Sequence, residues 1–177
     1  MKNTKSIALE QGVLSRIRIR ATLIALVGGV ATPFLAHMLP AYNGTPVGAI
    51  LLAMFYAPLV AVLVSRFHVG LIVAALAPLL NVLITGHPDW SIAPVLTIEL
   101  ILFVSFVYFL SRQKAIGWLS APVAYIAAKT VSTAAIAVFP AILNVNPADF
   151  WLNSIVNGSA GLAVLTAINI AALKLRS

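Results

Sequence analysis

Six long apolar stretches restrict the fold of this chain more than any other feature of its sequence. Each holds about 17 to 24 residues, and they cover residues 21–39, 47–64, 69–85, 91–110, 119–139 and 150–173. An α-helix needs about 20 apolar residues to cross the hydrocarbon core of a bilayer. Because backbone polar groups inside lipid must be paired within the segment, each stretch is expected to form one helix. The sequence therefore predicts an all-α integral membrane protein with six transmembrane helices.

The overall composition supports this class. Hydrophobic residues make up 62% of the 177 residues, charged residues make up 8%, and the mean hydropathy is +1.06. Soluble domains carry about 25% charged residues, so a soluble globular domain is excluded. The chain has no cysteine, which excludes disulfides, thiolate catalysis and cysteine-ligated metal.

The basic residues divide unequally between the two sides of a six-span topology. Of the eleven Lys and Arg residues, five precede the first span, three lie in the turns at Arg66 and at 112–114, and two follow the sixth span. The opposite side receives Asp89 and Asp149 and no basic residue. Since positive residues mark cytoplasmic loops, both termini are predicted to be cytoplasmic. The net charge of +7 thus reflects orientation among membrane lipids and argues against a nucleic-acid partner.

Two ionisable residues lie deep inside predicted spans, Glu99 in the fourth and Lys129 in the fifth. A charge at such depth costs between ~2.5 and ~17 kcal/mol, so both are interpreted as functional. In consecutive antiparallel helices the two residues lie at similar depth, which makes a buried pair feasible. The sequence leaves open whether they bind each other, a substrate or a proton.

Other polar residues gather in the outer half of the predicted bundle. They are His37 late in the first span, Asn81 late in the third, and Asn153 and Asn157 one helical turn apart in the sixth. Together with Glu99 and Lys129 they predict a pocket open to the exterior, with Trp90, Trp151 and Tyr42 available as aromatic walls. In the alternative interpretation, the Asn and His side chains only hydrogen-bond neighbouring helices.

The chain thus divides into two parts. Residues 1–20 are predicted to be a basic cytoplasmic segment, and residues 21–177 a six-helix transmembrane substrate-binding domain. Small residues recur every four positions at Ala21, Ala25 and Gly29 in the first span. Such a face permits close approach of another helix, which belongs either to this chain or to another subunit.

Sequence motifs for catalysis are absent. The chain contains no G-x-x-x-x-G-K-[ST] phosphate loop, no H-E-x-x-H, no G-x-S-x-G and no acidic cluster. We therefore expect no enzyme activity, no metal centre and no cofactor, and no ATP hydrolysis through a phosphate loop of its own.

Two segments resemble the substrate-binding S components of energy-coupling factor (ECF) transporters. They are Ala77-Pro-Leu-Leu-Asn81-Val-Leu-Ile-Thr85-Gly86-His87-Pro88 and Ala93-Pro-Val-Leu-Thr-Ile-Glu99-Leu100. In that family an A-P-L-L-x-x-L-x-T-G-x-P stretch precedes a span with an embedded Glu. The segment Leu35-Ala-His37-Met-Leu-Pro40 and the basic Lys129 also fit the family pattern. The likeness covers about half of the chain.

The resemblance implies a function and partners. Family members capture a vitamin or related micronutrient outside the cell, and a coupling transmembrane subunit with ATP-binding subunits drives its uptake. An Ala-x-x-x-Ala face on the first helix docks on the coupling subunit, and Ala21, Ala25 and Gly29 match it, with Gly in place of a third Ala. The resemblance also implies a multi-pass protein of a prokaryotic plasma membrane.

The ligand and the transport mode stay open. An acid and a base suit a ligand with a carboxylate, amide or amine. His37 and His87 could instead ligate the metal of a tetrapyrrole such as cobalamin or haem. The main alternative function is a small autonomous proton-coupled carrier or channel that uses Glu99 and Lys129. A membrane enzyme would need more polar residues near the basic face.

Overall fold

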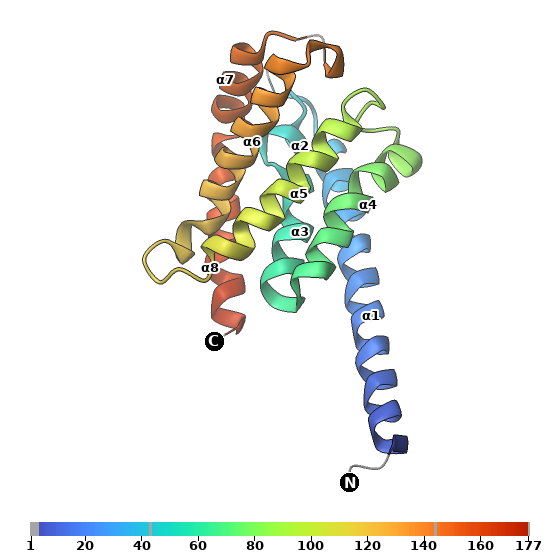
Figure 1. The fold of residues 1–177 in the computed structure, drawn as a ribbon. Coiled ribbons are helices and arrows are strands. Elements are labelled where there is room, and N and C mark those ends of the chain that lie inside the picture. The colour runs from blue at the N-terminus through green and yellow to red at the C-terminus, as the bar shows by residue number, and fades with distance from the viewer. Residues whose placement is uncertain (1–3, 43, 144, 177) are drawn as a thin grey trace.

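A computed structural model describes residues 4–42, 44–143 and 145–176 of the chain, and these ranges contain helices but no strand (Figure 1). The elements in order are α1 (Thr4–His37), α2 (Val47–Ile50), η1 (Ala53–Phe55), α3 (Tyr56–Val60), η2 (Ala61–Ser65), α4 (Phe67–Thr85), α5 (Ala93–Leu110), η3 (Gly117–Leu119), α6 (Ser120–Val138), η4 (Pro140–Ile142), α7 (Pro147–Asn157) and α8 (Ser159–Arg176). The predicted all-helical class is confirmed.

Among the residues that the structure describes, four helical stretches are long and apolar enough to cross a membrane. They are Ile19–His37, Phe67–Thr85, Ala93–Leu110 and Gly117–Val138. Helices α7 and α8 meet at a bend of 58° and give a fifth span if they act as one broken helix. The structure therefore supports four to five spans, and a sixth stays a prediction that depends on the segment between α1 and α4.

That segment, predicted as one helix over residues 47–64, is divided into short pieces. The helix ends after Ile50, and Leu52 adopts a left-handed conformation with φ 56°. The Tyr56 hydroxyl donates a hydrogen bond to the Leu51 carbonyl, which the break leaves without a helical partner. Pro58 lies in the first turn of α3, where its missing N–H breaks no helical bond.

The helices pack in chain order around this divided segment. Helix α4 contacts α1 and α5, α5 contacts α6, and α6 contacts α7 and α8 (Figure 1). The short helix α3 contacts α1, α4 and α8, so it fills the middle of the bundle. The largest fully buried side chains include Phe103 of α5 and Leu59 of α3. The core thus joins α3 to the long apolar helices.

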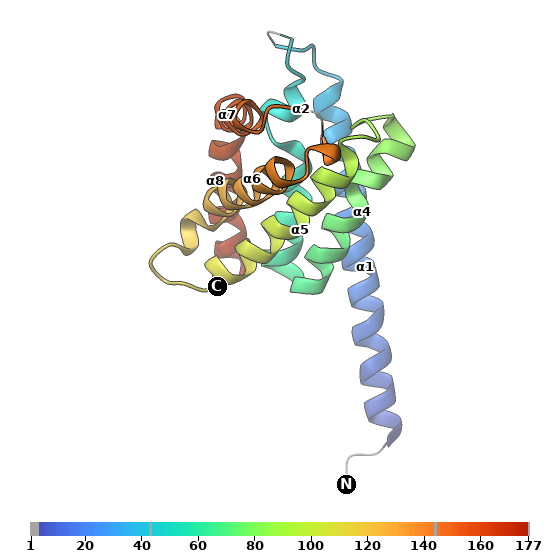
Figure 2. The same cartoon turned by 45° about the horizontal axis from the view of Figure 1, so that its top comes forward.

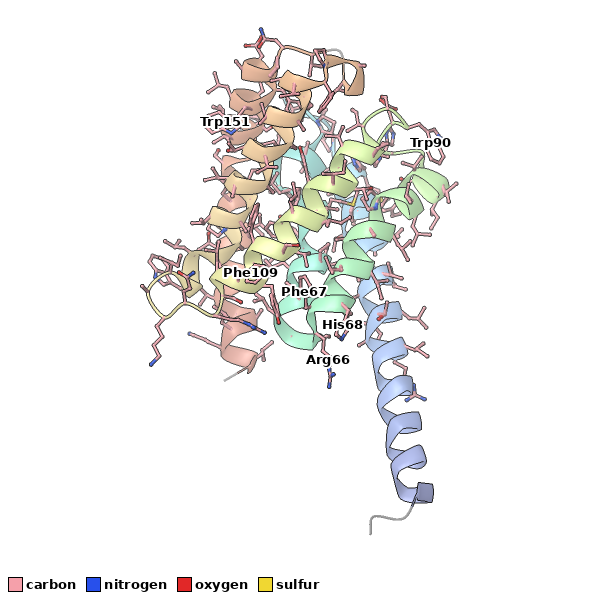
Figure 3. The ribbon with its side chains drawn as sticks, viewed as in Figure 1. Arg66, Phe67, His68, Trp90, Phe109 and Trp151 are labelled. Carbon is pink, nitrogen blue, oxygen red and sulfur yellow. The ribbon has the colours of Figure 1, made fainter. Side chains whose placement is uncertain are left out.

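The two ends of the bundle differ in the residues they carry. The start of α1, the end of α8 and Arg66 lie at one end, which we call the basic end, and Trp90 and Trp151 lie toward the other (Figure 3). We call the second one the loop end, because it carries the described residues 38–42, 44–46, 86–92, 139–143 and 145–146 (Figure 2). This arrangement is the one expected from the predicted topology, although the assignment of the basic end to the cytoplasm stays a prediction.

Helix α1 is continuous from Thr4 to His37, so the predicted boundary at residue 20 falls inside a helix. Residues 1–3 of the predicted basic segment lie outside the described residues. The N-terminal half of α1 extends away from the other helices in both views (Figures 1 and 2). The basic segment is therefore an extension of the first span.

Candidate functional site

A cavity of about 650 Å³ opens among the helices at the loop end. Its lining residues come from five segments of the chain and are Pro33, His37, Thr45, Pro46, Gly48, Ala49, Leu52, Met54, Phe55, His87, Pro88, Asp89, Ile92, Leu96, Glu99, Tyr125, Lys129, Val145, Asn146, Asp149, Phe150, Asn153, Ser154, Asn157 and Gly158. A concave, largely apolar cavity with a few polar groups is the usual form of a small-molecule site. Five of the seven predicted substrate-binding residues line it: His37, Glu99, Lys129, Asn153 and Asn157.

Glu99 and Lys129 form a buried ion pair in this cavity. The Lys129 Nζ lies 2.8 Å from both Glu99 Oε1 and Oε2. Ser132 donates a hydrogen bond of 2.7 Å to Glu99 Oε1. The pair that the sequence made feasible is therefore formed, and its two charges compensate each other in a site where an isolated charge would be costly.

The pair is held by one face of α6 and by an aromatic ring. Tyr125, Lys129 and Ser132 are spaced by four and three residues, so they share a side of α6. The Lys129 Nζ lies 4.5 Å from the centre of the Phe150 ring, within the range of a cation–π contact. Tyr125 donates to the Ser154 carbonyl at 3.2 Å, which joins α6 to α7. The ammonium group is thus enclosed on several sides.

Two histidines stand side by side at the cavity. The rings of His37 and His87 are stacked, with centroids 5.3 Å apart and planes inclined by 26°. Gly48 of α2 lies against His37, since a Cβ there would be 3.3 Å from its Nε2. Both imidazoles are available to a ligand at the mouth. Among the residues that the structure describes, no three His, Cys, Asp or Glu side chains form a group that could hold a metal ion.

Asn81 lies outside the lining and has a structural environment. It is 1% exposed, and its Nδ2 donates to the carbonyl of Gly29 at 2.9 Å and to that of Ala77 at 2.8 Å. Pro33 has no N–H, so the Gly29 carbonyl lacks its usual donor four residues along α1. Asn81 supplies the missing donor from α4. The alternative interpretation from the sequence, a hydrogen bond to a neighbouring helix, describes this residue.

The three predicted aromatic walls also lie outside the lining. Trp90 is 63% exposed and Tyr42 is 68% exposed, both near the loop end (Figure 3 labels Trp90). The Trp151 Nε1 donates to Thr130 at 3.1 Å, on α6. The aromatic side chains that do line the cavity are Phe55, Tyr125 and Phe150.

These three rings and Ser132 were not predicted to belong to the site. The spacing of Tyr125 and Ser132 from Lys129 was a usable signal, because residues three and four apart share a helical face. Phe55 offered no such signal, since it follows a break inside an apolar stretch that carries no polar residue at that point. Phe150 depends on the position of α7, which the sequence does not reveal.

The small-residue face of α1 is partly used inside the chain. Gly29 is buried, and a Cβ at this position would lie 3.2 Å from the Cβ of Ala77 and 3.6 Å from that of Ala57. Internal helix packing against α4 and α3 therefore accounts for the glycine at position 29, and its contact with another subunit stays a prediction. Ala25 packs partly against the core, and Ala21 is half-buried near the projecting part of α1.

A second buried asparagine fixes the basic end. Asn169 of α8 is fully buried, accepts a hydrogen bond from Ser120 at 2.9 Å, and donates to the carbonyls of Gly117 and Trp118. It joins α8 to the start of α6 and lies outside the cavity.

Comparisons of this chain with protein-family models, with curated proteins and with solved structures find no match.

Proposed function

We propose that this protein is a membrane-embedded substrate-capture subunit for the ATP-driven uptake of a vitamin or related micronutrient. It would work with a separate coupling transmembrane subunit and ATP-binding subunits, as its resemblance to ECF S components implies. The proposed location is a prokaryotic plasma membrane, with the loop end outside. Helices of membrane-spanning length are compatible with that location.

The observation that carries the proposal is the cavity with the Glu99–Lys129 pair inside it. The volume of about 650 Å³ lies in the range of small-molecule sites, which is about 300–1,000 Å³. Its lining takes residues from the loops at the loop end, including Thr45, Pro88 and Val145, so a ligand can enter there. A tetrapyrrole stays one candidate ligand, because His37 and His87 stand together.

The sequence and the surface of α1 both support a need for partners. The chain has no phosphate loop with which to hydrolyse ATP. Ala21 is small and half-buried, and it lies close to exposed apolar side chains of α1, Leu23 and Ile24. We propose this part of α1, with Ala25 at its edge, as the surface for the coupling subunit.

Uptake measurements with and without partners test the proposal. The purified protein in liposomes should bind a micronutrient and give no flux, either with or without an imposed proton gradient. Co-reconstitution with the coupling and ATP-binding subunits of the same organism should give ATP-dependent uptake. Proton-driven flux by the protein alone would instead establish the autonomous carrier and overturn the capture function.

A pair of variants separates docking from folding. Ala21→Leu adds bulk to the proposed surface, so it should leave ligand binding unchanged and reduce uptake by the assembled transporter. Gly29→Leu, in contrast, adds bulk inside the chain against Ala77, and should lower the yield of folded protein. Normal uptake by Ala21→Leu would remove this surface from the proposal.

A further inference from the structure

The charges around the cavity are unbalanced. Four charged side chains line it among the described residues: the acids Asp89, Glu99 and Asp149, and the base Lys129. With neutral histidines the lining therefore carries three negative charges and one positive charge. A cleft with low-dielectric walls concentrates the field of such charges, so the imbalance acts on any ligand that enters.

The single cation of the lining is already occupied. Lys129 contacts both carboxylate oxygens of Glu99 at 2.8 Å and also faces the Phe150 ring. A carboxylate or phosphate of a ligand would have to displace Glu99 and leave that acid buried without its partner, which is costly. The ion pair is thus unsuited to bind an anion.

The two remaining acids are exposed and stand at the loop end. Asp89 lies between α4 and α5, and Asp149 lies in the first turn of α7. Arg66 lies at the basic end (Figure 3), and Lys114 lies in the turn that follows α5. They cannot neutralise the acids at the mouth, because charges separated by more than about 10 Å in solvent are largely screened.

Aromatic and imidazole rings complete the lining. Phe55 and Tyr125 lie edge to face with centroids 5.1 Å apart, and both line the cavity. The faces and edges of such rings suit flat ligands, and their π-electrons attract cations. Neither these rings nor the stacked histidines offer a permanent positive charge to an anion.

We infer that the ligand of this cavity is an organic cation, or a ligand whose ring carries a positive charge, and that the mouth rejects anionic micronutrients. This inference rests on the proposed function and narrows its substrate class. It disfavours haem among the tetrapyrroles, because haem carries two carboxylates. Asp89 and Asp149 attract the cation, and Glu99 remains paired with Lys129 beneath it.

Thermal unfolding of the full-length protein in detergent tests the inference with compounds that differ in charge. Nicotinate, nicotinamide and 1-methylnicotinamide share one ring and carry a negative, zero and positive charge; pantothenate and thiamine add an anion and a cation of larger size. We expect a cation to raise the unfolding temperature and the anions to leave it unchanged. Calorimetric titration of the strongest binder then gives its affinity.

Variants that each change the net charge by one unit provide the controls. Asn153→Asp adds a negative charge to the cavity lining and should tighten the cation at least about threefold, and Asp149→Asn should weaken it by a similar factor. Lys114→Gln changes the net charge by the same amount as Asn153→Asp, but in the turn after α5, and should leave the affinity unchanged.

The outcomes distinguish the inference from the function on which it rests. An anion as the strongest binder, or a weaker cation affinity in Asn153→Asp, would overturn the cationic class and leave the capture function standing. Equal effects of Asn153→Asp and Lys114→Gln would also overturn it, because the cavity charge would then have no special role. Binding of none of the five compounds would count against both.

Discussion

Pro33 and Asn81 illustrate how single residues decide the form of this bundle. The proline removes the donor that the Gly29 carbonyl would find in a regular helix, and Asn81 replaces it from α4 at 2.9 Å. The bond ties α1 to α4 about two turns before His37, which lines the cavity. A site residue on α1 is therefore held in place by a residue that does not touch the cavity.

A coupled pair of substitutions checks this relation. Asn81→Leu should destabilise the protein by about 1 kcal/mol, the scale of interhelical hydrogen bonds in membranes. In a Pro33→Ala background the loss should be smaller, because the new backbone N–H satisfies the Gly29 carbonyl. Thermal unfolding of the four proteins measures the coupling, with Asn157→Leu as an exposed control. Equal losses in both backgrounds would contradict the proposed compensation.

The buried ion pair makes a second prediction at this scale. Glu99→Gln or Lys129→Met alone leaves one buried charge unpaired and should cost about 3–5 kcal/mol. The double variant should lose less than the sum of the two, and all three variants should remain monodisperse. Unfolding temperatures and size-exclusion profiles of the three variants check this. Additive losses would show that the two residues do not stabilise each other.

At the residue scale, the sequence was sufficient to predict that the two buried charged residues share a site, but not to predict the roles of the amide residues. Glu99 and Lys129 could be placed in one site because a charge in an apolar helix needs compensation, whatever the details of packing. Asn81, Asn153 and Asn157 could not be divided into cavity-lining residues and residues that bond a neighbouring helix, since all three are amides in apolar stretches. Their roles depend on helix rotation, and for Asn81 on a carbonyl that a proline in another helix leaves free.

At the scale of the elements, the helical break at Leu51 and Leu52 lies close to the bend between α7 and α8. The non-helical backbone at Leu51 and Leu52 packs on α8, and a Cβ at Gly161 would lie 2.5 Å from Leu52 Cγ and 2.7 Å from the Leu51 carbonyl carbon. Close to it, α7 and α8 bend by 58° at Gly158, which lines the cavity with Leu52. Irregular backbone at membrane depth is tolerated where protein covers it or where it lines a cavity.

A glycine comparison checks the role of this contact. Gly161→Ala should destabilise the protein by about 1–3 kcal/mol, because its methyl group meets backbone atoms that cannot move aside. Gly28→Ala is the matched control in α1: its nearest neighbour would be 3.9 Å away, and the gain in helix propensity should make it neutral or stabilising. Chemical or thermal unfolding of both gives the difference. Equal effects would rule out a special contact between the breaks.

The break in the second apolar stretch is also where sequence-based prediction of the elements ends. Residues 47–64 have the length and hydropathy of a span, and no glycine or polar residue marks Leu52 as a turn. The left-handed conformation there depends on the space that Gly158 and Gly161 leave more than 100 residues later. By contrast, α4, α5 and α6 follow their predicted ranges to within a few residues, because their apolar runs end in clear turns.

The molecule as a whole places its polar chemistry at one end. The cavity, the ion pair and two exposed acids lie toward the loop end, while Arg66 and the start of α1 lie at the basic end. The pattern of basic turns predicted this polarity, since alternating spans bring every second turn to one side. In the proposed capture function the two ends have different roles: a ligand would enter at the loop end, and α1 would present a surface for partners toward the basic end.

Native mass spectrometry of the purified protein tests the central claim, that the cavity captures a small molecule, most directly. Protein extracted from cells grown in vitamin-rich medium should carry one small-molecule adduct. Ala49→Trp, which fills the cavity from an exposed position on α2, should fold normally and lose that adduct, while Leu83→Trp on the outer surface of α4 should retain it. A wild-type protein free of adduct, or an adduct retained by Ala49→Trp, would contradict capture in this cavity.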